Sequence, residues 1–249
     1  MTKLPISVCL FTSTRGHYQA STCNDTLNLL ARLIPLDLFG ALYAHIKVTP
    51  GEEALGIKME LDLTTRGFGV DATVGGWQRG ASHQQAYLID MRKASQSRVL
   101  LSQPYMLLLE DDSPFICHGD DTVGCLIRMV RMLEQDPNLV STRFIRRGDY
   151  DGGVPHLHDE ADHFYSPHFD FQPAILRSRD YFLANKVLEA YWGQVSAMQC
   201  EMAMRMALDN LTRDPSRAHL VWKPDYAETY HLGIPNHAEE LARITPFFS

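Results

Sequence analysis

The chain has 249 residues, of which 45% are hydrophobic and 21% charged, and its formal net charge at pH 7 is −7. These proportions are those of an ordinary globular protein and exclude a disordered chain, a collagen and a coiled coil. The negative charge argues against a generally basic nucleic-acid-binding protein, and no apolar run approaches the ~20 residues that a membrane span needs.

Apolar runs and helical periodicities alternate through the first 145 residues. Strands are predicted at 6–11, 37–48, 59–63, 105–109 and 140–145. Helices are predicted at 21–33, 82–95 and 122–135. This alternation is typical of an α/β protein whose central sheet is mostly parallel and flanked by helices.

The second half of the chain has a different texture. Residues 149–168 are rich in Gly, His, Asp and Pro and predict a long functional loop. Strands are then expected at 169–176 and 218–222, helices at 179–191 and 194–211, and a polar tail at the end. Because the sequence has no internal repeat or linker, it predicts a single domain over 1–249.

The cysteines of the chain are odd in number, scattered, and never spaced as Cys-x-x-Cys. They are Cys9, Cys23, Cys117, Cys125 and Cys200. Such a pattern predicts reduced thiols rather than a disulfide framework or a zinc knuckle. The first residues also lack the long apolar stretch of a secretion signal. Together these features predict a cytoplasmic protein.

Three consecutive acids, Glu110, Asp111 and Asp112, follow directly after the apolar strand predicted at 105–109. Like charges at one strand end repel one another unless a cation or hydrogen-bond donors neutralise them. The carboxyl ends of strands form the ligand crevice of an open α/β sheet, and carboxylate oxygens favour Mg²⁺ or Mn²⁺. The motif therefore predicts a metal site that bridges to a diphosphate; a solvated acidic turn before the next helix is the alternative.

Hydroxyl groups and one arginine follow the first predicted strand, in residues 12–17. Hydroxyls, backbone N–H groups and a guanidinium suit a nucleotide base or phosphate, although an ordinary turn has the same composition. The segment matches neither a dinucleotide-binding glycine motif nor a P-loop. Arg143, Arg146 and Arg147 are a second candidate contact for phosphate, so modified DNA stays open as a binding partner. A solvated strand end is the alternative for these arginines.

Five metal-ligating side chains lie close together in the predicted loop: His156, His158, Asp159, Asp162 and His163. They approach the spacing of metallo-β-lactamase-type hydrolases, but the Asp-His pair comes two residues too late. The cluster supports a metal-dependent hydrolase as an alternative function. A lid over the substrate, or a surface loop that happens to contain histidines, are the other interpretations.

Two further residues are candidates by their surroundings. Glu201 lies early in an otherwise apolar predicted helix, so it faces either solvent or a pocket in which it acts as a general base. His231 follows the last predicted strand in the sequence Tyr-His-Leu-Gly, where a lone histidine is more often structural.

In this order, these segments resemble the GT-A class of nucleotide-sugar glycosyltransferases. The run Leu-Leu-Leu-Glu110-Asp111-Asp112 is particularly similar to the acidic motif of N-acetylglucosaminyltransferase-type members. The resemblance implies a GT-A-like fold, with a nucleotide-sugar-binding half at 1–115 and an acceptor-binding half at 116–249. It implies that Asp112 and His231 bind the metal ion and that Asp111 contacts the ribose or the donor sugar.

The resemblance also assigns roles in donor binding and catalysis. The base and ribose pocket would be lined by Thr12, Ser13, Arg15, Arg79 and Gln84. Glu201 would be the general base, with Asp170 as its substitute because Cys200-Glu201 stands where the family has two acids. A further acid between the first strand and the metal motif would be Asp71 or Asp90.

The activity that follows is a transfer of a sugar from a nucleoside-diphosphate donor, in the first instance a UDP-sugar, to an acceptor hydroxyl. Mn²⁺ or Mg²⁺ would neutralise the leaving diphosphate, and one direct displacement would invert the anomeric centre. The acceptor would be a saccharide or another hydroxyl-bearing molecule. The metal-dependent hydrolase, and a non-catalytic nucleotide- or sugar-binding protein, are the alternatives.

Overall fold

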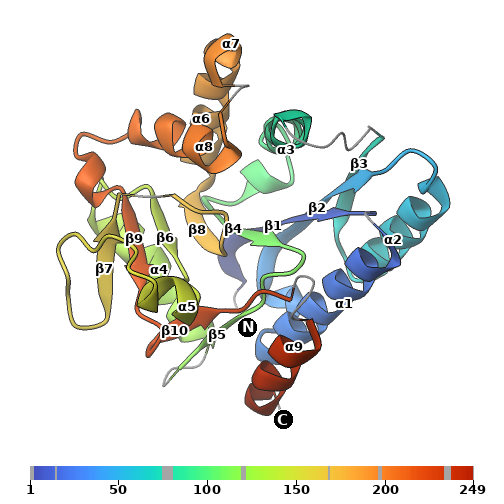
Figure 1. Cartoon of the computed structure of the whole chain (residues 1–249), viewed down its shortest axis with the longest axis horizontal. Coiled ribbons are helices and arrows are strands. Elements are labelled where there is room, and N and C mark those ends of the chain that lie inside the picture. Colours follow the sequence, from blue (N-terminus) through green and yellow to red (C-terminus); the bar gives the residue numbers. More distant parts are fainter. Residues whose placement is uncertain are drawn as a thin grey trace.

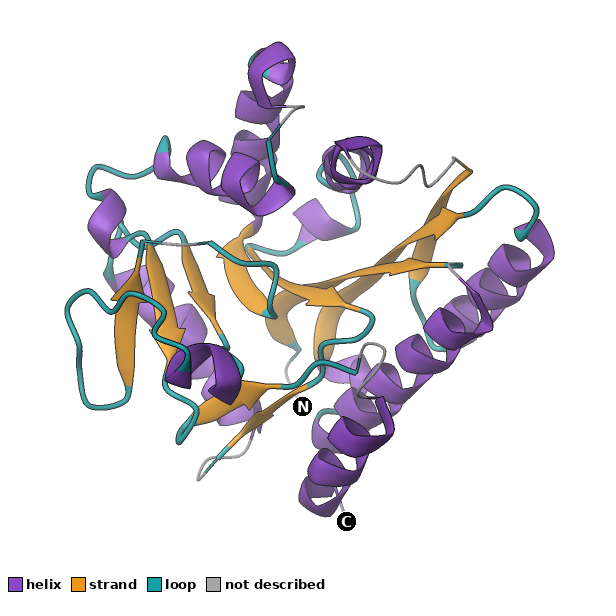
Figure 2. Ribbon diagram, viewed as in Figure 1, coloured by secondary structure: helices purple, strands orange, loops and turns teal. Residues whose placement is uncertain are grey.

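Within the described residues, eight strands form one sheet in the order β3-β2-β1-β4-β8-β6-β9-β7 (Figure 1). The computed structural model describes residues 3–14, 16–74, 81–118, 122–167, 169–195, 198–232 and 237–248. Helices cover both faces of this sheet (Figure 2). The expected α/β architecture is thereby confirmed.

The first half of the sheet is parallel. Strand β1 (Leu4–Ser13) pairs with β2 (Phe39–Val48) and β4 (Tyr105–Glu110), and β2 pairs with the edge strand β3 (Gly69–Val74). All residues of β1 except Pro5 are buried, as expected of a central strand with helices on both sides. Parallel pairing brings the carboxyl ends of β1 and β4, at Ser13 and Glu110, to one edge of the sheet.

The second half of the sheet mixes directions. Strand β8 (Ala174–Arg177) is antiparallel to both β4 and β6 (Ser141–Arg143). Strand β9 (His219–Trp222) then runs parallel to β6, and β7 (His163–Ser166) closes the edge in the antiparallel sense. Strands β6 and β9 therefore end on the same side of the sheet as β1 and β4.

Alternate side chains of β1 pack into two separate cores, because successive residues of a strand point to opposite faces. Val8 and Leu10 join the core formed by α1 (Gly16–Leu33), α2 (Glu53–Thr65) and α4 (Thr122–Gln135). Cys9 and Phe11 join the other core. Its helices are α3 (Ala81–Ala94), α6 (Ser178–Ala190) and α8 (Cys200–Asp209).

A second, smaller sheet lies beside the carboxyl edge of the first. It pairs β5 (Phe115–Cys117) with β10 (Ala227–Thr229) in the antiparallel sense. The remaining elements are short: α5 (Arg147–Asp151), α7 (Trp192–Val195), α9 (His237–Ile244) and the 3-10 turns 36–38, 100–102, 215–217 and 245–248. Within the described ranges, no helix combines the length and apolar character needed to cross a membrane.

Several sequence-based expectations are corrected by the structure. The strand expected at 59–63 lies inside α2, where Met59 and Leu63 are buried one turn apart while Leu61 is 65% exposed. The alternation of apolar residues there is a by-product of helical spacing. The loop expected at 149–168 includes the end of α5 and all of β7. Helix α9 occupies part of the expected polar tail.

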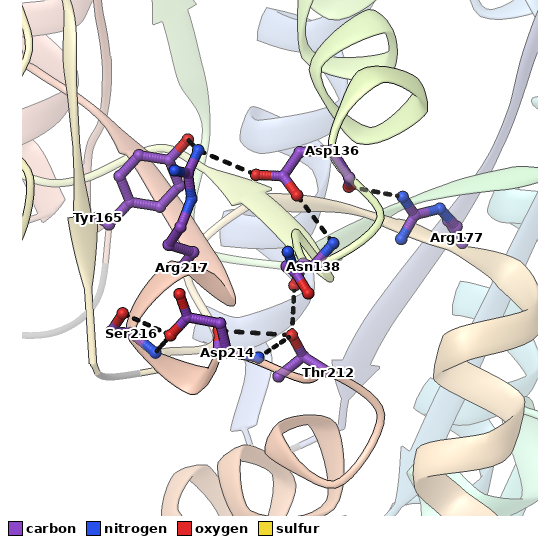
Figure 3. Close-up of polar contacts among 8 residues, drawn as sticks. All are labelled: Asp136, Asn138, Tyr165, Arg177, Thr212, Asp214, Ser216 and Arg217. Atoms are coloured by element: carbon purple, nitrogen blue, oxygen red, sulfur yellow. Dashed lines mark hydrogen bonds and ion pairs between the residues drawn. The ribbon is translucent and has the colours of Figure 1, made fainter.

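Arg177 connects β8 to the end of α4 (Figure 3). Its guanidinium donates hydrogen bonds to the backbone oxygens of Leu133, Asp136 (3.1 Å) and Leu139 (2.7 Å). The last carbonyls of a helix have no partner within the helix. Arg177 therefore supplies donors for the α4 terminus from the central sheet.

We expect Arg177→Met to lower the free energy of unfolding by about 2–3 kcal/mol, because three partly buried carbonyls lose a charged donor. Arg217→Met is the matched control: it removes a more exposed guanidinium that contacts the Asp136 carboxylate (3.1 Å) and the Tyr165 hydroxyl (3.2 Å). Its expected cost is about 1 kcal/mol or less. Urea denaturation of both variants measures the difference, and equal losses would contradict the assigned role of Arg177.

Candidate active site

Asp111 is fixed between β1 and β4 at the carboxyl edge of the sheet. The Thr12 hydroxyl donates to Asp111 Oδ2 (2.7 Å), and the Asp111 backbone N–H donates to the Phe11 carbonyl (3.1 Å). From α1, the Thr26 hydroxyl donates to the Asp111 carbonyl (2.8 Å). Thr12 and Ser13, both expected to line a nucleotide pocket, are buried here. Thr12 thus supports the acidic motif from inside the sheet.

Asp112 meets His231, which lies far away in sequence. The segment after β10 runs along the segment before β5: the N–H of Tyr230 donates to Pro114 O (2.9 Å) and that of Leu232 to Asp112 O (2.7 Å). These bonds continue the antiparallel register of β5 and β10 into residues 112–114 and 230–232. They bring His231 Nε2 to 3.0 Å from Asp112 Oδ2.

The two side chains stabilise each other's charged forms. Burial alone would raise the pKa of Asp112, but the hydrogen bond and charge of His231, with a further hydrogen bond from Ser113, hold that pKa below its usual value. The hydrogen bond to Asp112 raises the pKa of His231. His231 remains 45% exposed at its side chain, so the pair lies on an accessible rim.

The pair fits a divalent cation by its chemistry and spacing once His231 has lost the proton that it shares with Asp112, because an imidazole ligand is neutral. Neighbouring ligands of an octahedral ion, each about 2.1 Å from the metal, lie about 3 Å apart, which is the separation of the Asp112 and His231 atoms. In the described part of the chain, no group of three or more His, Cys, Asp or Glu side chains is arranged to hold a metal ion. Two protein ligands completed by water and phosphate oxygens are common for ions of this type.

Glu110 faces away from this rim. Its carboxylate accepts a hydrogen bond from the Tyr87 hydroxyl of α3 (2.8 Å). Burial, together with the charges of Asp112 and Asp111, raises the pKa of Glu110 well above its usual value. The repulsion expected among three adjacent acids is thus relieved, because each carboxyl group has a separate partner: Tyr87 for Glu110, Thr12 for Asp111 and His231 for Asp112.

Asp170, in the segment just before β8, lies near the acidic motif 110–112. Its Oδ2 atom is 3.8 Å from Nη1 of Arg143, whose side chain is only 2% exposed, while Asp170 itself is 43% exposed. The charge of Asp170 contributes to the raised pKa of Glu110, so the two carboxyl groups are within electrostatic range. Asp170 borders a cavity of about 470 Å³ that also includes Arg146 and Asp149.

A second cavity, of about 240 Å³, includes His231. It shares Arg146, Gly148 and Asp149 with the cavity at Asp170. Helix α5, which contains two of these residues, therefore lies between the Asp112–His231 pair and Asp170. The structure brings both predicted regions to one side of the molecule.

Glu201 is in the first turn of α8 and is partly buried. Its Oε2 atom accepts a hydrogen bond from the Cys200 thiol (3.3 Å). Cys200 packs in the same core as Phe11, and the charge of Glu110 contributes to the raised pKa of its thiol. The start of α8 therefore approaches the acidic motif from the face opposite α1.

The histidine cluster of residues 156–163 does not converge on one point. The His156 ring packs between Tyr150 (4.9 Å between centroids) and Phe164 (3.9 Å). His163 Nδ1 is hydrogen-bonded to Asp162 (2.7 Å), whereas the His158 ring meets the edge of another aromatic ring. This arrangement does not favour the metal-dependent hydrolase.

Some of the remaining candidate residues lie outside the described part of the chain, and the others are paired with neighbouring side chains. Arg15 and Arg79 lie outside the described residues, as does the side chain of Gln84. Asp90 is buried against Lys47 (3.1 Å), and Asp71 accepts a hydrogen bond from Tyr43 (3.0 Å). Of the basic run expected to contact phosphate, Arg143 is buried, and the other two arginines pair with acids: Arg146 with Asp149 (2.7 Å) and Arg147 with Asp225 (2.9 Å).

Solved structures share the fold of this chain at low sequence identity. A mannosyltransferase from Pyrobaculum calidifontis, in complex with GDP-Man and Mn²⁺, is 12% identical, with a TM-score of 0.50 over 96% of this chain and 60% of that one. GalNAc-T7 with UDP, GalNAc and Mn²⁺ is 11% identical, with a TM-score of 0.54 over 91% and 43%. No family model matches the sequence, and the search of curated proteins finds no relative.

A third structure has a different described activity. A putative glucose-1-phosphate thymidylyltransferase from Bacillus anthracis, in complex with a sucrose, is 8% identical, with a TM-score of 0.56 over 96% of this chain and 94% of that one. The chain spans less than two thirds of the two glycosyltransferases and nearly all of this third protein. The expected likeness to GT-A glycosyltransferases is confirmed at the level of the fold.

Proposed function

We propose that this protein transfers a sugar from a nucleoside-diphosphate donor to an acceptor hydroxyl, using a divalent metal ion held by Asp112 and His231. The observation that carries the proposal is the 3.0 Å contact between these two side chains. It lies at the carboxyl edge of a parallel sheet, where α/β proteins bind ligands. The glycosyltransferases of the same fold, described with GDP-Man and Mn²⁺ or with UDP, GalNAc and Mn²⁺, support it.

The proposed donor half is 1–115. In this proposal Asp111, which is held by Thr12 and by two contacts of its backbone, binds a ribose or donor-sugar hydroxyl. Ser13, Arg15, Arg79 and Gln84 complete the proposed nucleotide pocket. We propose UDP as the nucleotide of the donor. We propose Mn²⁺ rather than Mg²⁺ as the ion, because Mg²⁺ binds oxygen ligands whereas an imidazole favours transition metals.

The proposed acceptor half is 116–249, where the two cavities flanking α5 lie. When bound, the metal ion neutralises negative charge on the leaving diphosphate. Glu201 accepts the proton of the acceptor hydroxyl as that oxygen attacks the anomeric carbon. Asp170, paired with buried Arg143 (3.8 Å), orients the acceptor. A single displacement of this kind inverts the anomeric centre.

The second candidate function is a sugar nucleotidyltransferase. It is supported by the Bacillus anthracis protein, which this chain matches over 94% of that protein's length. The two reactions release different products: a transferase releases a nucleoside diphosphate from a nucleotide sugar, whereas a nucleotidyltransferase releases pyrophosphate from a nucleoside triphosphate.

The deciding experiment measures both products with the same protein preparation and Mn²⁺. One arm contains UDP- or GDP-sugars with a panel of saccharide acceptors, and the other contains nucleoside triphosphates with glucose 1-phosphate. We expect release of nucleoside diphosphate that depends on the acceptor. Pyrophosphate release alone would establish the second candidate. Donor binding without either product would indicate a non-catalytic binding protein.

We expect His231→Ala to weaken donor binding in Mn²⁺ by about 10–100-fold or more, because even the outer partners of a metal ligand contribute that much to metal affinity. In EDTA the loss of donor affinity should be small. Titration calorimetry with UDP, the nucleotide part of the proposed donor, measures this difference in Mn²⁺ and in EDTA. Equal losses with and without Mn²⁺ would indicate that the imidazole only packs against Asp112.

A further inference from the structure

Tyr87 lies where α3 meets the acidic motif. Its hydroxyl donates a 2.8 Å hydrogen bond to Glu110 Oε1, and Glu110 directly precedes Asp111. Burial, followed by the charge of Glu110, raises the pKa of Tyr87 well above its usual value, so the hydroxyl stays a proton donor. Through this bond, α3 fixes the residue from which the metal-binding turn begins.

The ring of the same tyrosine contacts two segments that are far apart in sequence. On one side it packs against Phe11 of β1, with 5.6 Å between centroids. On the other side it meets Phe171 edge-on at 5.1 Å, and Phe171 meets Phe169 edge-on at 5.3 Å. Aromatic pairs at these separations contribute beyond their buried area.

Asp170 stands between these two phenylalanines. Both rings are buried, whereas the Asp170 side chain is 43% exposed and borders the cavity shared with Arg146. The two buried rings anchor the chain on either side of Asp170, and the ring of Tyr87 contacts one of them, Phe171.

We propose that Tyr87 is a positioning residue that sets the acidic motif and the Asp170 segment relative to each other. The hydroxyl acts through Glu110 on the acidic motif, which belongs to the proposed sugar-donor half. The ring acts through Phe171 on the Asp170 segment, which belongs to the proposed sugar-acceptor half. This inference rests on the proposed transferase function for its kinetic consequences. The coupling of the two segments is a separate property that is measured without turnover.

The two actions can be separated by substitution. Tyr87→Phe keeps the ring and removes the hydroxyl, so we expect the KM for the donor in Mn²⁺ to rise about 3- to 10-fold, the worth of one hydrogen bond, with kcat nearly unchanged. Tyr87→Leu also removes the ring contacts. It should additionally lower kcat by at least 10-fold, because small misplacements of a reacting group cost large factors in rate.

Tyr181→Phe is the matched control. Tyr181 is a buried tyrosine of the same core, and its hydroxyl donates to the Met91 carbonyl of α3 (3.3 Å). Its hydroxyl bonds the α3 backbone rather than Glu110, so its removal costs stability of the same order as loss of the Tyr87 hydroxyl without breaking the bond to Glu110. We therefore expect a lower melting temperature with donor KM and kcat unchanged.

Hydrogen exchange gives the readout that does not need activity. In Tyr87→Phe we expect faster exchange of the Asp111 amide, which is bonded to Phe11 O (3.1 Å), and in Tyr87→Leu also faster exchange at 169–172. Tyr181→Phe should change neither segment. Exchange in both Tyr87 variants that matches the control would overturn the inference, whether or not the wild type is a transferase. A wild type without transferase activity but with these exchange differences would overturn the proposed function alone.

Discussion

Asp112→Asn is expected to remove nearly all transferase activity and the Mn²⁺-dependent part of donor binding. The carboxylate is the partner of His231 at 3.0 Å, and its amide analogue lacks the negative charge that binds a cation. The loss should exceed the roughly 10–100-fold that outer partners of a metal ligand contribute. Calorimetric titration of UDP with and without Mn²⁺, together with the rate of UDP release, measures both effects.

The fold should survive this substitution. The Asp112 backbone carbonyl, which accepts the N–H of Leu232 (2.7 Å), is unchanged in the variant. Asp37→Asn, at an exposed acid before β2, is the control for a change of charge alone. Mn²⁺-dependent affinity equal to that of the wild type would rule out Asp112 as a metal ligand.

Glu201→Gln is expected to lower turnover by about 10²–10⁴-fold with donor affinity nearly unchanged, because the amide keeps the shape of the side chain but cannot accept the proton. The position supports this role, since the first turn of α8 approaches the motif and Glu201 contacts the neutral Cys200 thiol (3.3 Å). Single-turnover measurements with saturating donor isolate this step from product release.

Asp170→Asn is the comparison for that result. Asp170 faces the Arg143 guanidinium (3.8 Å) and borders the cavity beside α5, so it is placed to position an acceptor. We expect this variant to raise the KM for the acceptor more than it lowers kcat. If instead Asp170→Asn has the large loss in turnover while Glu201→Gln stays within a few-fold of the wild type, the roles of the two acids are exchanged.

The acidic motif could be found from the sequence because its signal is local. Five apolar residues at 105–109 predict a buried strand, so the acids that follow it must stand at the strand's end. Parallel pairing with β1 then places Thr12 beside Asp111. Only the first step depends on a pattern within about ten residues, which a single sequence contains; the contact of Thr12 with Asp111 joins residues far apart in the chain and required the structure.

The partners of the motif carried no such local signal, and His231 was assigned only through the family resemblance. His231 reaches Asp112 through the pairing of β5 and β10, two strands of three residues each, which are too short for a periodicity. Tyr87 is one aromatic residue in a helix, and its bond to Glu110 depends on how α3 packs on the sheet. Edge strand β3 was missed because its side chains are largely exposed and show no apolar pattern.

The β5–β10 pairing also has a consequence for how the protein is made. A ribosome releases the motif at 110–112 long before it releases 227–232, so the nascent chain holds Asp112 without His231 for a large part of synthesis. The parallel strands β1 to β4 are all released before that point, whereas part of the core they pack against, including Leu220 and Ala227, is released with the last elements. Closure of a loop this long adds little further entropy cost once its neighbours are in place. The two-ligand rim is therefore assembled late, once the segment that contains β10 has been released and pairs with β5.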